Sequence, residues 1–134
     1  MQRPSSILIT GASSGIGEAL AQRYAATGIS LALSGRDETR LDRVAGHCRK
    51  SGALVETKVL DVTDQPAMET WIQNVDSHRP LELVIANAGV SVDTSGLPET
   101  ADRIQRMLDI NIRGVLNTVL PILPCMVKRQ AGQI

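Results

Sequence analysis

The chain has 134 residues, 43% of them apolar, and no net formal charge, which is the size and composition of one globular domain. Lys plus Arg equals Asp plus Glu at 14 each, so nothing in the charge balance indicates a nucleic-acid or membrane partner. Cys48 and Cys125 are too few for a disulfide framework, and His47 and His78 lack metal-ligand spacing. The apolar runs are too short for a signal peptide or a membrane span, so we expect a soluble, cytoplasmic protein without bound metal.

Strand-like and helix-like segments alternate along the first part of the chain. The predicted strands are Ser6–Thr10, Ile29–Gly35, residues 53–62 and Leu81–Ala86. A helix is predicted after Gly17, with Gly28 as its natural end. A second helix is predicted between Asp37, a possible N-cap, and Gly52, with Leu41, Val44, Ala45 and Cys48 on one face.

A third helix is predicted from Asp64, its possible N-cap, with Pro66 in the first turn. Its apolar face would consist of Met68, Trp71, Ile72 and Val75. After a loop through Gly96, a long helix is predicted from near Pro98. Its apolar spacing is carried by Ile104, Leu108, Ile112, Val115, Leu116, Val119 and Leu120. Pro121 and Pro124 should kink or end this helix.

Alternating strands and helices predict an α/β fold with a doubly wound parallel sheet, in the strand order 3-2-1-4. In the last four residues, "AGQI", Gly132 is expected to end the helix. The final "QI" resembles the beginning of a fifth strand. We therefore expect residues 1–134 to form a single, incomplete domain. The fourth strand would then present a bare apolar edge, which favours pairing or aggregation.

A glycine-rich turn, "TGASSGIG", follows the first predicted strand from Thr10 to Gly17. Gly11 would permit the tight turn, Gly15 would let the backbone approach a pyrophosphate, and Gly17 would let the helix pack closely on the sheet. The free N–H groups at the helix start would attract the anion. The spacing is G-x-x-x-G-x-G and not G-x-G-x-x-G, so a plain tight turn is the alternative.

Three further motifs accompany this turn: "DVTD" at Asp61–Asp64, "ANAG" at Ala86–Gly89 and "NIRG" at Asn111–Gly114. Together, in this order and at approximately this spacing, the four motifs resemble the short-chain dehydrogenase/reductase family over nearly the whole chain. The resemblance implies a Rossmann-like fold that binds a nicotinamide dinucleotide.

The resemblance also implies roles for individual residues. Asp61 would accept a hydrogen bond from the adenine amino group, although it could instead be a helix cap or turn residue. Asn111 would support catalysis by helping to hold a proton-relay water; its alternative is an exposed polar residue of a helix, although Asn without a partner is awkward in an apolar helix. The implied cofactor-binding residues are Gly11, Ser13, Ser14, Gly15, Ile16, Gly17, Arg36, Asp61, Val62, Asn87, Ala88, Gly89 and Ile110.

The choice between NAD and NADP depends on the end of the second strand. Asp37 lies about 20 residues beyond the glycines, which is the separation of an acid that binds the ribose 2′-hydroxyl of NAD. Aligned with the family pattern, however, the end of the strand is Gly35, and Arg36 follows as a planar donor suited to a phosphate. We expect NADP(H) to be preferred over NAD(H), with an ordinary solvated charge as the alternative role of Arg36.

Family catalysis requires a Ser and a Tyr-x-x-x-Lys motif that this chain lacks, because its one tyrosine, Tyr24, is followed by "AATG". One interpretation is the amino-terminal part of a reductase that transfers hydride between NADP(H) and a small carbonyl or alcohol, inactive by itself. The other is a natural half-domain that binds a nucleotide or a partner without redox chemistry. Family members pair through the long helix after strand four, so self-association into a homo-oligomer is expected.

Overall fold

The computed structural model describes residues 3–91 and 99–134, and its centre is one parallel sheet. The strand order is β3-β2-β1-β4, as predicted. The four strands are β1 (Ser6–Ile9), β2 (Ser30–Gly35), β3 (Leu54–Val59) and β4 (Leu83–Ile85). In this register Ile7 of β1 lies between Leu31 of β2 and Leu83 of β4. All four strands therefore end at the same edge, where ligands of doubly wound folds bind.

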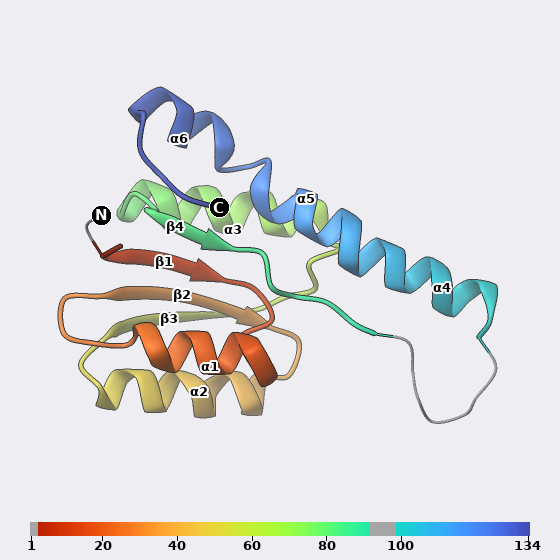
Figure 1. Ribbon diagram of the computed structural model, residues 1–134, viewed down its shortest axis with the longest axis horizontal. Coiled ribbons are helices and arrows are strands. Elements are labelled where there is room, and N and C mark those ends of the chain that lie inside the picture. Colours follow the sequence, from red (N-terminus) through yellow and green to blue (C-terminus); the bar gives the residue numbers. More distant parts are fainter. Residues whose placement is uncertain (1–2, 92–98) are drawn as a thin grey trace.

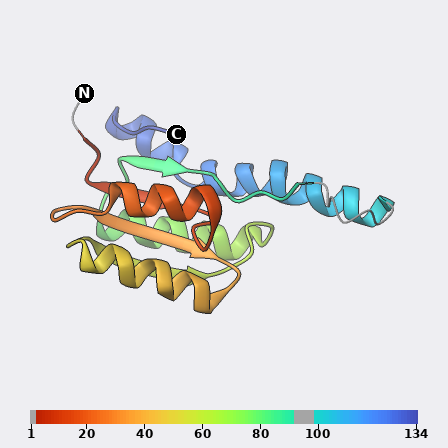
Figure 2. The ribbon, with the colours of Figure 1, turned by 60° about the horizontal axis from the view of Figure 1, so that its bottom comes forward.

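Helices cover both faces of this sheet (Figure 1). They are α1 (Gly15–Tyr24), α2 (Glu38–Lys50), α3 (Gln65–His78), α4 (Ala101–Leu108), α5 (Gly114–Val119) and α6 (Leu123–Arg129), with one π-helical turn, η1 (Asp109–Arg113), between α4 and α5. One apolar core lies under α1 and α2, and the second lies under α3, α5 and α6. Both ribbon views show α4 extending beyond the sheet (Figures 1 and 2), and none of its side chains is buried.

The predicted helix caps and apolar faces are confirmed. Asp37 accepts a hydrogen bond from the Arg40 N–H at the start of α2, and Asp64 accepts one from the Ala67 N–H at the start of α3. The apolar residues predicted for these two helices are buried. These elements could be predicted because capping and helical periodicity are local properties of the sequence.

Several predicted boundaries are wrong by a few residues. Helix α1 begins at Gly15 and ends at Tyr24, before Gly28, because Ala25 has an extended backbone (ψ 117°) that stops the helix. Strand β4 begins only at Leu83, because the Leu81 N–H donates to the side chain of Asp76 instead of to the sheet.

The long final helix is interrupted, as its prolines predicted. Its expected start near Pro98 lies outside the described residues, and Pro121 stands in the turn between α5 and α6. By length and hydropathy alone, the described run of helical turns at 101–129 could cross a membrane, with a mean hydropathy of 1.5. A core helix passes the same test, and here Ile110, Ile122 and Met126 are buried in the core beside α3.

The edge of β4 is partly paired by the end of the chain. Gln133 forms a parallel bridge to Leu83: its N–H donates to the Glu82 carbonyl, and its own carbonyl accepts from the Val84 N–H. The predicted first step of a fifth strand is thus present, and the edge is less bare than expected.

Candidate cofactor site

The glycine turn is held in place by the residues that follow β4. The backbone N–H groups of Asn87 and Ala88 donate to Thr10 Oγ1 at 3.1 and 3.2 Å. The side-chain amide of Asn87 donates to the carbonyls of Thr10 and Gly11 at 3.1 and 3.2 Å. Asn87 and Ala88 therefore brace the glycine turn, and Asn87 fixes where the backbone of the turn lies.

The three glycines of the turn have three different environments. Gly11 has a φ of +65°, and a Cβ there would lie 2.8 Å from the Ala88 Cα. Gly15 has a φ of +56° with no atom within 4 Å of a Cβ position, so it leaves the space above it open. A Cβ on Gly17 would overlap the Gly11 carbonyl oxygen and lie 2.6 Å from Asn87 Nδ2. A Cβ would therefore collide at Gly11 and Gly17, and the positive φ of Gly11 and Gly15 favours glycine.

A cleft of about 730 Å³ lies at the carboxyl edge of the sheet, beside this turn. The predicted cofactor-binding residues all line it except Gly17, which is buried beneath the turn where it packs α1 on the sheet. The cleft is lined by Gly11, Ser13, Ser14, Gly15, Ile16, Ser34, Gly35, Arg36, Asp37, Arg40, Leu60, Asp61, Val62, Asn87, Ala88, Gly89, Val90 and Ile110. Residues far apart in the sequence thus meet at one elongated site.

Asp61 is the turn residue that was weighed as its alternative role, and its expected hydrogen bond with adenine stays a prediction. One carboxylate oxygen accepts hydrogen bonds from the N–H and hydroxyl of Thr63 at 2.9 and 2.8 Å, so it forms a turn. The other oxygen lies 3.7 Å from Arg106 Nη2. Burial by itself raises the pKa of Asp61, but the Thr63 hydrogen bonds and the positive charges of Arg106 and Arg36 outweigh it and lower that pKa. Asp61 therefore stays a carboxylate that can accept a hydrogen bond at neutral pH.

The backbone of Val62 beside it is held by α5. Asn117, which is buried, donates from its side-chain amide to the Val62 carbonyl at 2.9 Å. A Cβ on Gly114 would lie 2.6 Å from a methyl group of Val62. These contacts fix the distance between α5 and the cleft wall.

Asn111 occupies the middle of the π-helical turn η1, a feature that is frequent at functional sites. Its side-chain oxygen accepts from the Val90 N–H at 2.8 Å, and its side-chain nitrogen donates to the Val90 carbonyl at 2.7 Å. The amide therefore positions the segment after "NAG", and it keeps one N–H and one lone pair for another partner. Its role with a proton-relay water stays a prediction.

Strand β2 ends at Gly35, beside the glycine turn. A Cβ on Gly35 would lie 2.9 Å from the Ser13 hydroxyl, so a carboxylate at this position would require Ser13 to move. Asp37 is engaged as the N-cap of α2 and lies 3.4 Å from Arg40 Nε. Arg36 is exposed and lines the cleft.

Comparison with known proteins agrees with this geometry. The family model described as short chain dehydrogenase matches residues 5–134. The chain belongs to the short-chain dehydrogenase family. The order of the strands in its sheet is that of a Rossmann-like α/β fold.

Several solved structures that resemble this chain contain a nicotinamide dinucleotide, and two of them serve as examples. A Sphingobium yanoikuyae short-chain dehydrogenase in complex with NADPH is 34% identical, with a TM-score of 0.83 over 95% of this chain and 50% of that chain. An NAD⁺-bound xylitol dehydrogenase is 26% identical, with a TM-score of 0.84 over 96% of this chain and 50% of that chain.

Among curated proteins, sulfoacetaldehyde reductase 2 of Chromohalobacter salexigens is 36% identical over 94% of this chain and 50% of its own length. The chain spans about half the length of the curated relatives it matches.

The residues of the cleft fit the dinucleotide that the family implies. Three features of the glycine turn suit a pyrophosphate. A Cβ on Gly11 would disturb the turn, the space above Gly15 is open, and α1 begins there. The hydroxyl of Ser34, a residue of the cleft wall, is buried and has no hydrogen-bond partner among the described residues.

Sequence reasoning gave no site role to Ser34, Arg40, Leu60 and Val90, which line the cleft, or to Asn117, which holds the Val62 backbone. A signal existed for Asn117, because an Asn in an apolar helix needs a partner, as was argued for Asn111. Tyr24 lies on α1 against the core under α1 and α2, outside the residues that line the cleft.

Proposed function

We propose that this chain is the cofactor-binding part of an oxidoreductase that transfers hydride between NADP(H) and a small carbonyl or alcohol substrate. The single observation that carries the proposal is the cleft, where the glycine turn, Asp61, the "NAG" segment and Ile110 meet. NADP(H) is preferred because Gly35 offers no carboxylate, Asp37 is engaged as a cap and Arg36 is exposed at the cleft wall.

Different residues of the cleft would bind different parts of the cofactor. The start of α1 and the hydroxyls of Ser13 and Ser14 would hold the pyrophosphate, and Asp61 with the Val62 backbone would hold the adenine. Ala88, Gly89 and Ile110 would lie against the cofactor further along the cleft. A bound nicotinamide would donate or accept the hydride. Asn111 holds the Val90 backbone in the cleft wall through two hydrogen bonds. The general acid of the family is not among these 134 residues, since the chain has no Tyr-x-x-x-Lys motif.

Calorimetry with NADPH and NADH tests the cofactor assignment. We expect the chain to bind NADPH about tenfold more tightly, because hydrogen bonds to a charged phosphate contribute roughly 1.5 kcal/mol or more. The same preparation should not reduce a carbonyl above the level of its Y24F variant. Equal or tighter binding of NADH would contradict the preference for NADP(H), and turnover would contradict the assignment of catalysis to residues outside this chain.

Self-association through the final helices is part of the proposal. Ile104, Leu108, Ile112, Leu116 and Leu120 form one stripe along α4, η1 and α5, each between 43% and 57% exposed. Light scattering should show a homo-oligomer that the Leu116→Glu variant dissociates, because burying a charge in the apolar contact is unfavourable. Leu54→Glu, at a leucine on β3 that is 60% exposed against 48% for Leu116, should leave the oligomer intact. A monomeric wild-type chain at high concentration would contradict this part.

A cytoplasmic location is also proposed, since both cysteines are free thiols, Cys48 in the core and Cys125 at the surface. Oxidation of these thiols in the protein isolated from its cell would contradict it.

A further inference from the structure

The peptide group between Val62 and Thr63 is held at both of its polar atoms. Its carbonyl oxygen accepts a hydrogen bond from the side-chain amide of Asn117 at 2.9 Å. Its N–H donates to one carboxylate oxygen of Asp61, also at 2.9 Å. Asn117 lies on α5, 55 positions after Val62, and is only 7% exposed. A buried side chain of α5 and a carboxylate of the cleft are thus joined through a single peptide plane.

Asn117 prevents this peptide plane from turning over. A peptide group is planar, so a rotation that takes its carbonyl away from Asn117 also takes its N–H away from Asp61. The carbonyl can only accept a hydrogen bond, and the Asn117 side chain supplies the donor from the buried side. Removing that donor leaves the plane free to rotate, and the Asp61 carboxylate then loses the N–H that sets its direction.

Two groups of this loop are left for a ligand. The Val62 N–H forms no hydrogen bond with residues 3–91 and 99–134, and the second carboxylate oxygen of Asp61 accepts none from these residues. Both residues line the cleft. A donor beside an acceptor is complementary to the edge of adenine, which carries an amino group next to a ring nitrogen. Hypoxanthine presents an oxygen and a ring N–H there, so both of its contacts would be mismatched.

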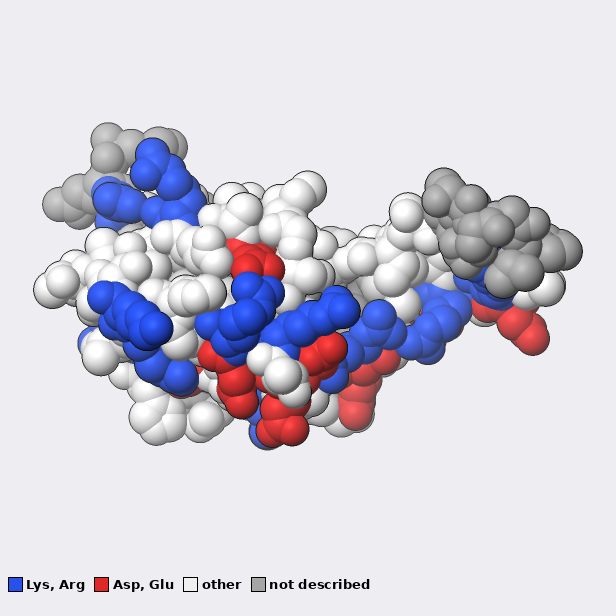
Figure 3. Space-filling model, turned by 90° about the horizontal axis from the view of Figure 1, so that it is seen from below, with Lys and Arg blue, Asp and Glu red and all other residues white. Residues whose placement is uncertain are grey.

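The cation beside Asp61 cannot orient the carboxylate in the same way. Viewed from below, Lys and Arg side chains with interspersed acids extend over α2 and along α4 (Figure 3). Arg106 of α4 is 58% exposed, and its Nη2 lies 3.7 Å from Asp61, which is longer than a hydrogen bond. Solvent screens an exposed pair of this kind. The direction of the carboxylate is therefore set by Thr63 and, through the shared peptide, by Asn117.

We propose that Asn117 is a positioning residue for recognition of the base: through the peptide group between Val62 and Thr63 it orients the groups that distinguish adenine from hypoxanthine. This inference rests on the proposed function, because it assumes that the adenine of the cofactor lies beside Asp61. Asn117 is not among the residues that line the cleft, so it acts only through the backbone. Loss of its donor should therefore weaken the binding of adenine nucleotides more than that of hypoxanthine nucleotides.

Adenosine 5′-diphosphate and inosine 5′-diphosphate test this role, because they differ in the base alone. Titrated calorimetrically into the whole wild-type chain, the adenosine nucleotide should bind about tenfold more tightly than the inosine nucleotide. The N117A variant should lose most of this difference. Its affinity for the inosine nucleotide should stay near the wild-type value, because the glycine turn is unchanged, and that affinity also shows that the variant is folded.

Thr118→Ala is the matched control on the same helix. Thr118 is 0% exposed, and its hydroxyl donates to the Gly114 carbonyl within the helix at 2.7 Å. T118A therefore also loses one buried hydrogen bond to a backbone carbonyl, but not one to the cleft wall. It should be less stable and keep the wild-type preference for the adenosine nucleotide. Hydrogen exchange at the Thr63 amide should be faster in N117A and unchanged in T118A.

The outcomes distinguish this inference from the proposed function. If the wild type prefers the adenosine nucleotide and N117A keeps that preference, or T118A loses it too, the role of Asn117 is overturned while the cofactor assignment stands. If the wild type binds the two nucleotides equally, base recognition beside Asp61 fails and the role of Asn117 fails with it. If N117A does not fold, the wild type decides: an unprotected Thr63 amide would show that the peptide is not held, and a protected one supports the role.

Discussion

The Gly17→Ala variant is expected to lose dinucleotide binding and to unfold more easily, by about 3 kcal/mol. The added methyl group would overlap the Gly11 carbonyl oxygen and lie 2.6 Å from the Asn87 amide. Both neighbours belong to the braced turn, so neither can move without breaking the hydrogen bonds that shape the cradle. Urea unfolding, followed by the fluorescence of Trp71, measures the stability, and calorimetry with NADPH measures the binding.

Gly46→Ala is the matched control, because it makes the same chemical change in a different environment. Gly46 lies within α2, and nothing is within 4 Å of a Cβ placed there. Alanine in a helix interior is more favourable than glycine by roughly 0.5–1 kcal/mol, so this variant should be more stable and should bind NADPH normally. Equal stability of the two variants would show that the turn is looser than the structure indicates.

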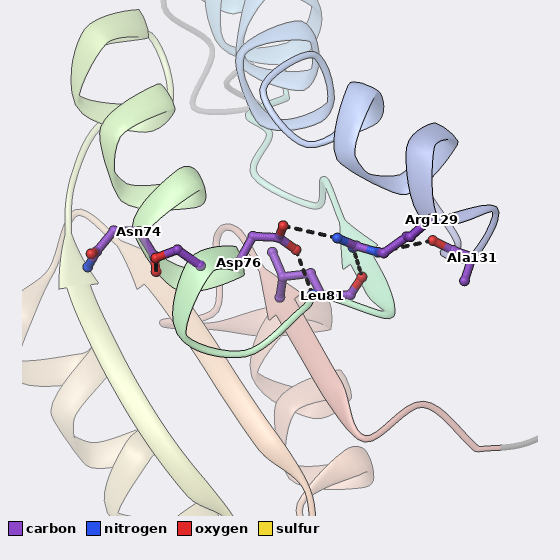
Figure 4. Close-up of polar contacts among 6 residues, drawn as sticks. Asn74, Asp76, Leu81, Arg129 and Ala131 are labelled. Carbon is purple, nitrogen blue, oxygen red and sulfur yellow. Dashed lines mark hydrogen bonds and ion pairs between the residues drawn. The ribbon is translucent and has the colours of Figure 1, made fainter.

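The Arg129→Gln variant is expected to lower the free energy of unfolding by about 2 kcal/mol. Arg129 joins three parts of the fold (Figure 4): its guanidinium donates to Asp76 at 3.0 Å, to the Leu81 carbonyl and to the Ala131 carbonyl. Asp76 in turn accepts from the Leu81 N–H at 2.7 Å. The Arg129 and Asp76 side chains are only 26% and 12% exposed, so solvent screens the pair weakly and the substitution leaves Asp76 without its cation.

Arg113→Gln provides the comparison for this network. Arg113 pairs with Asp109 at 3.4 Å on the helix surface, and its side chain is 63% exposed. Exposed pairs of this kind contribute roughly 0.5 kcal/mol or less. Hydrogen exchange should also be faster at the Gln133 amide in R129Q and unchanged in R113Q. Equal unfolding free energies for the two variants would contradict a stabilising role for the Arg129 network.

Local patterns were sufficient to predict much of this fold. Caps such as Asp37, helical faces and the parallel strand order follow from short-range chemistry and from the alternation of elements, and all of them are present. The ends of α1 and β4 could not be predicted, because they depend on the Ala25 backbone conformation and on the side chain of Asp76.

In the candidate site, too, features with a local sequence signature could be predicted and contacts between distant residues could not. The glycines and the "NAG" segment could be predicted because each has a local signature, and they do line or support one cleft. The pairings of Asn111 with Val90, Asn117 with Val62 and Arg40 with Asp37 could not be assigned, since a partner is set by packing in three dimensions. Polar side chains within apolar helices were nevertheless a usable signal that a partner must exist.

The hydrogen bonds between Thr10 and Asn87 join residues 77 positions apart, so the cradle forms only when the neighbouring strands β1 and β4 have already paired. Contacts of such long sequence separation form late in folding, because the entropy of closing the intervening chain must first be overcome. A nucleotide that binds the cradle will therefore bind only chains in which the sheet is complete. Its binding shifts the folding equilibrium toward those chains. The amount of nucleotide bound at saturation therefore measures the fraction of the protein that has folded. Saturating nucleotide should also raise the melting temperature by mass action.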